Sequence, residues 1–180
     1  MEPRRGSIEQ IGTVSGENHG RAAPVVSGSS LSAYIATGIR NCHETSNYNE
    51  GLEKINKGMN VLIREGSVAK DLEALIPLIT PETLDFIALC TDDMNVDDMA
   101  QKGGHISHII RKAIASGASP AAVYRIASYS AARIFGLKDR GLIAPGYRAD
   151  ALHSVQRKTV QAEDFQWATP DAGHSISQTH

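Results

Sequence analysis

The sequence feature that most constrains the fold is residues 86–93, where a short apolar run passes directly into Thr91, Asp92 and Asp93. Such a run, bordered by polar residues, is typical of a buried strand in a parallel sheet. In α/β proteins, functional side chains gather where the parallel strands end. Asp92 is therefore a candidate metal ligand or general base. Alternatively, Asp92 and Asp93 cap the helix that follows, since Asp is a favoured N-cap residue.

Two earlier predicted strands also end in polar residues. One leads into His43 and Glu44, and the next leads into Arg64 and Glu65, with Ser67 close behind. Because the ends of parallel strands lie side by side, we expect these polar residues to share one rim. A His and an Asp from neighbouring strands are suitable donors for a divalent ion that activates water. The alternative for the Arg-Glu sequence is an ordinary ion pair.

Amphipathic segments separate the apolar runs. In the segment 48–57 the apolar side is predicted to face the core, and Glu53, Lys54 and Lys57 are predicted to face solvent. Strands and helices alternate at spacings of roughly 20 to 30 residues, which is the βαβ pattern of a parallel sheet. Further helices are predicted over 31–36, 67–79, 95–98, 106–114 and 119–136.

The pattern gives three or four strand–helix units. A closed (β/α)8 barrel typically needs about 250 residues, and this chain has 180. The fold class is therefore α/β, as either a small open sheet or part of a barrel.

Composition and charge exclude several classes of function. The chain has 18 basic and 20 acidic residues, a balance that offers no electrostatic basis for binding nucleic acid or an anionic membrane. No apolar run approaches the roughly 20 residues that span a bilayer, and no secretory signal is predicted. The two cysteines, Cys42 and Cys90, make no disulfide framework, so we expect reduced, buried thiols in a cytoplasmic protein.

The candidate ion site has too few obvious ligands. His43 and Asp92 are two donors, whereas hydrolytic metal sites generally use three protein ligands, and His19 is the nearest further candidate. His43 is alternatively a hydrogen-bonded structural residue. His105 and His108, three apart on a predicted helix, have a spacing compatible with metal binding, or His105 simply begins that helix.

Five segments of the chain resemble the adenine deaminases of the amidohydrolase superfamily. They occur in the family's order and near its spacing, and together they are highly specific. The segments are 31–44 (LSAYIATGIRNCHE), 59–67 (MNVLIREGS), 89–93 (LCTDD), 104–106 (GHI) and 141–150 (GLIAPGYRAD). The resemblance implies a partial (β/α)8 TIM-type barrel, about the last four βα units, over residues 19–140. Residues 1–18 would be a loosely ordered lead-in, and 141–180 a truncated return segment and disordered tail.

The same resemblance implies an activity and roles for the residues singled out above. The family hydrolyses adenine to hypoxanthine and ammonia, with water activated by Mn²⁺ or Fe²⁺. His43 and Asp92 would bind the metal, and Asp92 would also take the proton from the attacking water. His19, the further candidate ligand, lies three residues before the place of the family's ligand. The purine substrate pocket would contain Glu44, Arg64, Glu65 and Ser67.

The chain also departs from the family's pattern. It contains no His-x-His pair, and the family's Asp-Gly-His motif would fall on residues 20–22, with Ala22 at the ligand's place. Residues 151–154 lack the hydrophobic strand that should enter a small β domain. We therefore expect the C-terminal half of an adenine deaminase barrel, weakly active or inactive as this chain.

Two other interpretations stay open. The chain is alternatively a non-catalytic remnant or subunit that associates with another chain, or an amidohydrolase acting on another purine. The exposed edge of a half barrel is a binding surface. We therefore expect a homo-oligomer or a pairing with a missing N-terminal half.

Overall fold

The structure is a computed structural model that describes residues 23–151. It has a mixed α/β architecture, as the alternation of strand and helix patterns predicted. The strands are β1 (Asn41–Cys42), β2 (Asn60–Arg64) and β3 (Ile87–Cys90). The helices are α1 (Gly28–Ala36), α2 (Tyr48–Asn56), α3 (Leu72–Leu75), α4 (Val96–Gln101), α5 (Ile106–Ala115), α6 (Pro120–Ala127) and α7 (Tyr129–Ile134). Two single 3₁₀ turns, η1 (Ile76–Leu78) and η2 (Leu84–Phe86), complete the set.

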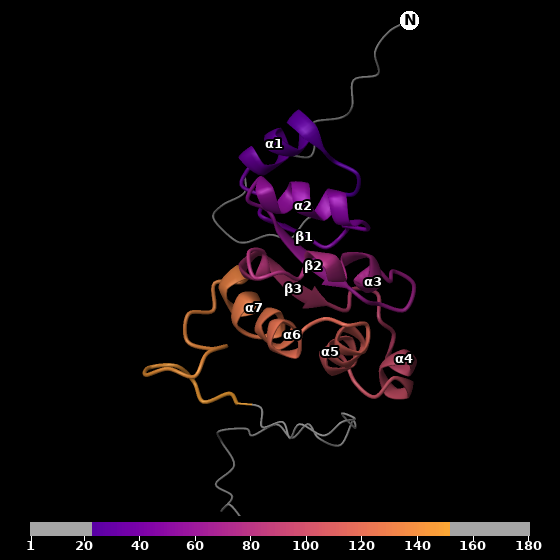
Figure 1. The fold of residues 1–180 in the computed structure, drawn as a ribbon, viewed down its shortest axis with the longest axis vertical. Coiled ribbons are helices and arrows are strands. Elements are labelled where there is room, and N and C mark those ends of the chain that lie inside the picture. Colours follow the sequence, from indigo (N-terminus) through magenta and orange to yellow (C-terminus); the bar gives the residue numbers. More distant parts are fainter. Residues whose placement is uncertain (1–22, 152–180) are drawn as a thin grey trace, which may run out of the picture.

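The sheet has the order β1-β2-β3, and each neighbouring pair is parallel. Consecutive strands are therefore neighbours, and the chain advances along the molecule from α1 to α5 (Figure 1). Pairing of β1 with β2 covers Asn41 with Asn60 and Cys42 with Val61. Pairing of β2 with β3 continues to Arg64 and Cys90. The parallel βαβ arrangement is confirmed, with three strands within residues 23–151.

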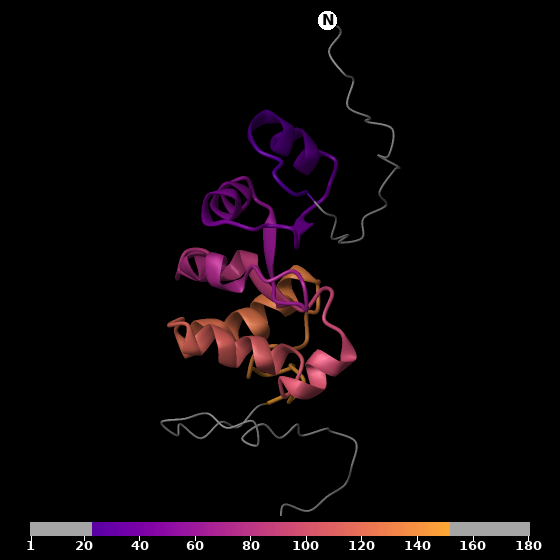
Figure 2. The ribbon, with the colours of Figure 1, turned by 90° about the vertical axis from the view of Figure 1, so that its right-hand side faces the viewer.

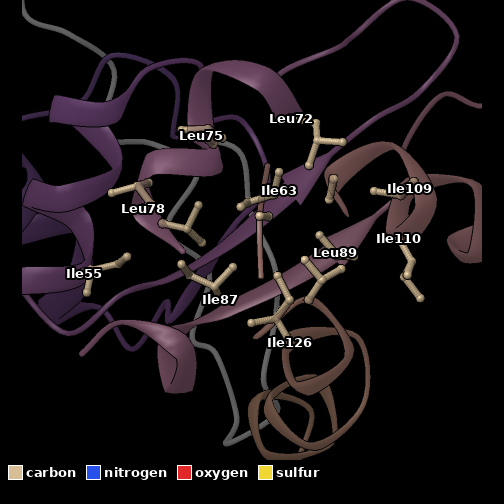
Figure 3. Packing of buried hydrophobic residues seen from close by; sticks show 14 residues of the cluster. Ile55, Ile63, Leu72, Leu75, Leu78, Ile87, Leu89, Ile109, Ile110 and Ile126 are labelled. Atoms are coloured by element: carbon tan, nitrogen blue, oxygen red, sulfur yellow. The ribbon is translucent and has the colours of Figure 1, made fainter. Parts of the chain in front are cut away.

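The main apolar core lies on one face of the sheet. Helices α2 and α3 lie on the same side of the strands (Figure 2), and Ile109 of α5 and Ile126 of α6 belong to the same core (Figure 3). The strands contribute every second residue to it, including Val61 and Ile63 of β2, because successive side chains of a strand point to opposite faces. This alternation fixes the face on which each residue at the strand ends emerges.

Helix α7 packs on the opposite face of the sheet, mainly against β3. Leu62 and Ala88 pack there against Ile134, with Cys90 at the margin. Arg64 has the same parity as Leu62 and follows it onto this face, whereas Glu65 has the parity of Ile63. Arg64 and Glu65, at the end of β2, therefore lie on opposite faces of the sheet.

Three sequence predictions about helices are corrected by the structure. The helix predicted over 119–136 is two helices, α6 and α7, which meet at Ser128. The helix predicted from Ser67 begins only at Leu72, because Lys70 forms an antiparallel bridge with Glu65. Lys54, predicted to face solvent, is completely buried.

Both cysteines are free, as predicted. Cys42 is buried and Cys90 is half-buried, and burial, followed by the negative charge of Asp92, raises the pKa of the Cys90 thiol to about 12. Within residues 23–151 no helix has the length and apolar character needed to cross a membrane. Residues 141–150 form turns, in agreement with their composition. The predictions for His19, for residues 1–18 and for the part of the 141–180 segment beyond residue 151 fall outside the described residues.

Candidate functional site

The ends of β1 and β3 bring His43 and Asp92 together. Nε2 of His43 lies 3.8 Å from Oδ1 of Asp92, and the two side chains are 30% and 31% exposed. Each residue directly follows a strand or lies two positions beyond one, so the parallel sheet places both at one rim. The predicted convergence of these two side chains is confirmed, and their roles as metal ligands stay predictions.

Arg64 extends from the end of β2 to the same rim. Its Nη1 atom is 3.3 Å from Oδ2 of Asp92 and 4.0 Å from Oε1 of Glu44. Its Nε atom donates a hydrogen bond of 2.5 Å to Oδ2 of Asp71. Burial disfavours the guanidinium charge, but the bond to Asp71 and the attraction of Asp71 and Asp92 outweigh it, so the pKa of Arg64 is raised. Arg64 is therefore a fixed positive charge beside Asp92.

Asp92 turns the chain immediately after β3. Its φ of 48° lies in the left-handed region, which Asp tolerates better than most residues. Neither Asp92 nor Asp93 caps the next helix, so that interpretation is wrong. The N-cap of α4 is Asn95, whose side chain accepts a hydrogen bond from the backbone N–H of Asp98. The Asp92 carboxylate is thus left to His43 and Arg64.

Asp93 instead ties the loop after β2 to the turn after β3. Its Oδ2 atom accepts the backbone N–H of Val68 at 2.8 Å and that of Ala69 at 3.4 Å. The bond from Val68, ahead of all other influences, holds the pKa of Asp93 below its usual value. A Cβ at Gly66 would overlap the Asp93 carboxylate and lie 2.7 Å from the carbonyl oxygen of Thr91. Glycine is therefore required where these two loops meet.

Two predicted substrate residues, Glu65 and Ser67, make hydrogen bonds to groups other than the His43–Asp92 pair. Glu65 is 3% exposed, and its Oε1 atom accepts a hydrogen bond of 2.8 Å from Nζ of Lys112 on α5. Ser67 accepts a hydrogen bond of 3.0 Å from the backbone N–H of Asn95. Strand parity explains the position of Glu65, and the loop that Asp93 holds explains that of Ser67. A substrate role for either residue stays a prediction.

The remaining candidate histidines, His105 and His108, lie at the start of α5. His105 is the N-cap residue of α5, and its Nε2 atom lies 2.7 Å from Oγ1 of Thr91. The prediction that His105 begins this helix is therefore confirmed. Burial first, and then the charges of Arg111 and Lys102, lower the pKa of His108, which favours the neutral imidazole.

Sequence reasoning missed a buried polar cluster behind His43. Nζ of Lys54 donates hydrogen bonds to Oε1 of Glu50 at 2.7 Å, to Oγ1 of Thr45 at 3.1 Å and to Sγ of Cys42 at 3.3 Å. We call these four residues the Lys54 clamp. Burial opposes ionisation of Glu50, but the bond from Lys54 and backbone N–H bonds outweigh it and lower the pKa of Glu50. The available signal was the spacing of Glu50 and Lys54, four residues apart on a helix.

The His43–Asp92 pair fits one side of a divalent cation. Imidazole nitrogen and carboxylate oxygen are both ordinary ligands of such ions, and Asp92 divides its two oxygens, with Oδ1 toward His43 and Oδ2 toward Arg64. In the part of the chain that the structure describes, no group of three or more His, Cys, Asp or Glu side chains is arranged to hold a metal. The described residues therefore offer two candidate ligands, and their role in metal binding stays a prediction.

The chain is similar in sequence to several known proteins. The chain is 55% identical over 141 residues to "Adenine deaminase 1" of Rhizobium etli, and 59% identical over 141 residues to "Adenine deaminase" of Sinorhizobium fredii. Each alignment covers 78% of this chain and 25% of the relative. "Adenine deaminase" of Cereibacter sphaeroides is 54% identical over 153 residues, 84% of this chain and 27% of that protein. The chain thus spans about a quarter of the length of the curated relatives it matches. The model of the "Amidohydrolase family" matches residues 27–162, and the chain therefore belongs to the amidohydrolase family.

Proposed function

We propose that this chain carries part of an adenine deaminase site, which hydrolyses adenine to hypoxanthine and ammonia. The observation that carries the proposal is the 3.8 Å approach of His43 Nε2 to Asp92 Oδ1 from two different strand ends. The similarity to proteins named adenine deaminase supports the substrate. The three parallel strand–helix units belong, in this proposal, to a (β/α)8 barrel.

In this proposal His43 and Asp92 hold one side of a divalent ion, Mn²⁺ or Fe²⁺. Such an ion, when bound, supplies Lewis acidity for the attack of water on C6 of the purine. A carboxylate oxygen of Asp92 accepts the proton from that water. Arg64 holds the carboxylate in place through Oδ2, and Asp71 holds Arg64 from behind. Glu44, within 4.0 Å of Arg64, faces the same rim and is the proposed purine contact.

The number of ligands limits the expected activity. The described residues supply two ligands, and a hydrolytic metal site generally uses at least three from the protein. We therefore propose that the chain by itself binds the ion weakly and deaminates adenine slowly or not at all. The further ligands come from residues outside 23–151 or from another chain.

Metal binding and activity test the two halves of this proposal separately. Mn²⁺ binding to the full chain is measured by the loss of the free Mn²⁺ signal in electron paramagnetic resonance. We expect binding that Asp92→Asn and His43→Gln abolish, with His108→Gln as the matched histidine control that preserves it. Equal binding by all three variants would refute the assignment of the pair.

Ammonia release from adenine tests the second half. Purified chain with Mn²⁺ is incubated with adenine, and with guanine as the comparison purine. Rapid ammonia release from adenine would refute the weak activity of the isolated chain while supporting the substrate. Release from guanine alone would refute adenine as the substrate.

A further inference from the structure

The loop that carries His43 and Glu44 has little support from the sheet. Strand β1 pairs with β2 only through Asn41 and Cys42, and the ladder stops one residue before His43. By contrast, the ladder between β2 and β3 reaches Arg64 and Cys90, and the backbone N–H of Glu65 continues it to the carbonyl oxygen of Cys90. Backbone pairing therefore positions Arg64, but it ends before it can position His43.

Lys54 contacts the residues on both sides of this unsupported pair. Its Nζ atom donates to Cys42, which precedes His43, and to Thr45, which follows Glu44. Thr45 Oγ1 also lies 3.8 Å from Cys42 Sγ, so the two flanking side chains are joined to each other as well. The third bond of Lys54, to Glu50, anchors the group to α2. An ammonium group has three donors, and all three are used here.

Glu50 extends the support to the rest of the loop. Its Oε2 atom accepts the backbone N–H of Ser46, and its Oε1 atom accepts that of Val25, which precedes α1. Asn47, the N-cap of α2, accepts the backbone N–H of Glu50. The start of α2 and the loop from Cys42 to Asn47 are therefore held as one hydrogen-bonded unit.

Burial of Lys54 has an energetic cost that packing alone does not explain. Lys54 is 0% exposed, and removing an ammonium group from water is unfavourable until its partners compensate. An apolar side chain of similar length would fill the same space, and replacing a buried ion pair by apolar groups is often neutral for stability. The hydrogen bonds from Lys54 to Cys42 and Thr45 fix the loop on both sides of His43. An apolar side chain at position 54 could not make these bonds.

We propose that Lys54 is a positioning residue, which orients His43 toward Asp92 by holding Cys42 and Thr45. The inference deepens the proposed function and rests on it for the metal role of His43. It concerns one element of the site, since Arg64 and Asp92 are held by other contacts. Loss of the clamp should release the His43 ring and leave the core of β2 and β3 intact.

The test uses a readout that needs no metal. In the full chain labelled in its histidine rings, the nuclear magnetic resonance signal of His43 should shift when Asp92 is changed to Asn, because the two groups are adjacent. We expect this response to disappear in a Lys54→Met background. Lys57→Met is the matched control, since Lys57 also pairs with a glutamate four residues earlier, but contacts Ser32 instead of the His43 loop. The response should survive in that control.

A second pair of variants keeps the test decisive if Lys54→Met fails to fold. Thr45→Val removes the hydroxyl that Lys54 contacts at nearly constant volume, and Thr45→Ser keeps it. We expect the His43 response to be lost in the first and restored in the second. Retention of the response in Lys54→Met, or in Thr45→Val, would overturn the proposal.

Mn²⁺ affinity then separates this proposal from the proposed function. Groups that orient a metal ligand typically change affinity by 10- to 100-fold when removed, so Lys54→Met should weaken Mn²⁺ binding about tenfold and Lys57→Met should leave it unchanged. Failure of the unmodified chain to bind Mn²⁺ would refute the proposed metal site, and the ring response would still decide the role of Lys54. Mn²⁺ binding that Lys54→Met leaves unchanged would overturn the positioning role alone.

Discussion

The two ends of the sheet are stabilised by different means. Beneath β2 and β3 the support is apolar, and fully buried side chains such as Ile63 and Ile126 belong to one cluster. At β1 a smaller apolar cluster, which includes Leu31, Cys42 and Met59, is joined by a buried polar group. In this polar group, Lys54, Glu50 and Thr45 hold the loop where the backbone ladder ends, and we call this side of the sheet the polar end. The apolar end beneath β2 and β3 has many apolar contacts, whereas the loop at the polar end depends on a few hydrogen bonds. The residue proposed to bind metal, His43, lies at the polar end.

The largest effect on stability should come from breaking the polar end on one side only. Glu50→Gln leaves the Lys54 ammonium buried without its counter-charge, and such losses typically cost about 3 to 5 kcal/mol. Urea unfolding should show this as a large fall in the midpoint. The control is Glu53→Gln on the same helix, whose partner Lys57 is partly exposed. A midpoint equal to that of the control would contradict the difference between the two ends.

A slightly smaller loss is expected from the apolar end. Ile126→Ala removes a fully buried side chain from α6 and should lower the free energy of unfolding by about 3 kcal/mol, through lost burial and the cavity left behind. Unlike Glu50→Gln, it should leave the His43 ring signal unchanged. The comparison residue is Val96, which is 78% exposed, so that Val96→Ala should change stability by no more than about 0.5 kcal/mol.

Removing a helix cap should cost about 1 kcal/mol of helix stability. Whether the loss is global or local should depend on whether the helix contributes buried residues. Asn47 and Asn95 make the same capping bond, at 3.0 Å and 2.9 Å. Helix α2 contributes buried residues, so Asn47→Ala should lower global stability by about 1 kcal/mol. Helix α4 contributes none, so Asn95→Ala should only increase local amide exchange. Equal global losses would show that the whole molecule depends on α4.

The smallest effect should appear in acid, at the polar end. The pKa of Glu50 is lower in the folded state than its ordinary value of 4.5, so its contribution to stability is complete above that pH. The contribution is lost as the pH falls through the lowered value, because protonation removes the attraction to Lys54. The urea midpoint should therefore drop less between about pH 6 and pH 3.5 in Glu50→Gln than in the unmodified chain. An equal drop in both proteins would contradict the pH-dependent contribution of Glu50.

Sequence reasoning succeeded where the local pattern determines the result. The segments before His43, Arg64 and Asp92 were predicted as strands, and parallel strands bring their ends together, so the shared rim was predictable. The burial of Lys54 was not, because an amphipathic pattern assigns every charged residue to solvent. Its burial depends on Cys42 and Thr45, which lie 12 and nine residues earlier in the chain.

The opposite positions of Arg64 and Glu65 could have been predicted from strand parity alone. Since Leu62 and Ile63 lie on opposite faces, the next two residues must also separate. The pairing of Glu65 with Lys112 on α5 could not be predicted, because the two residues are 47 positions apart and their contact depends on how α5 packs. The break of the last predicted helix at Ser128 likewise has no proline or glycine to signal it.

The separation of Arg64 from Glu65 also bears on the alignment of the strand itself. A slip of one residue in β2 would turn Glu65 toward Asp92 and Arg64 toward Lys112, so that like charges would meet on both faces of the sheet. Repulsion would then add to the exposure of apolar side chains that any such slip brings. The order of the two oppositely charged residues, Arg64 before Glu65, thus favours the observed register of β2 over a register shifted by one residue. This effect does not depend on any chemistry at the rim.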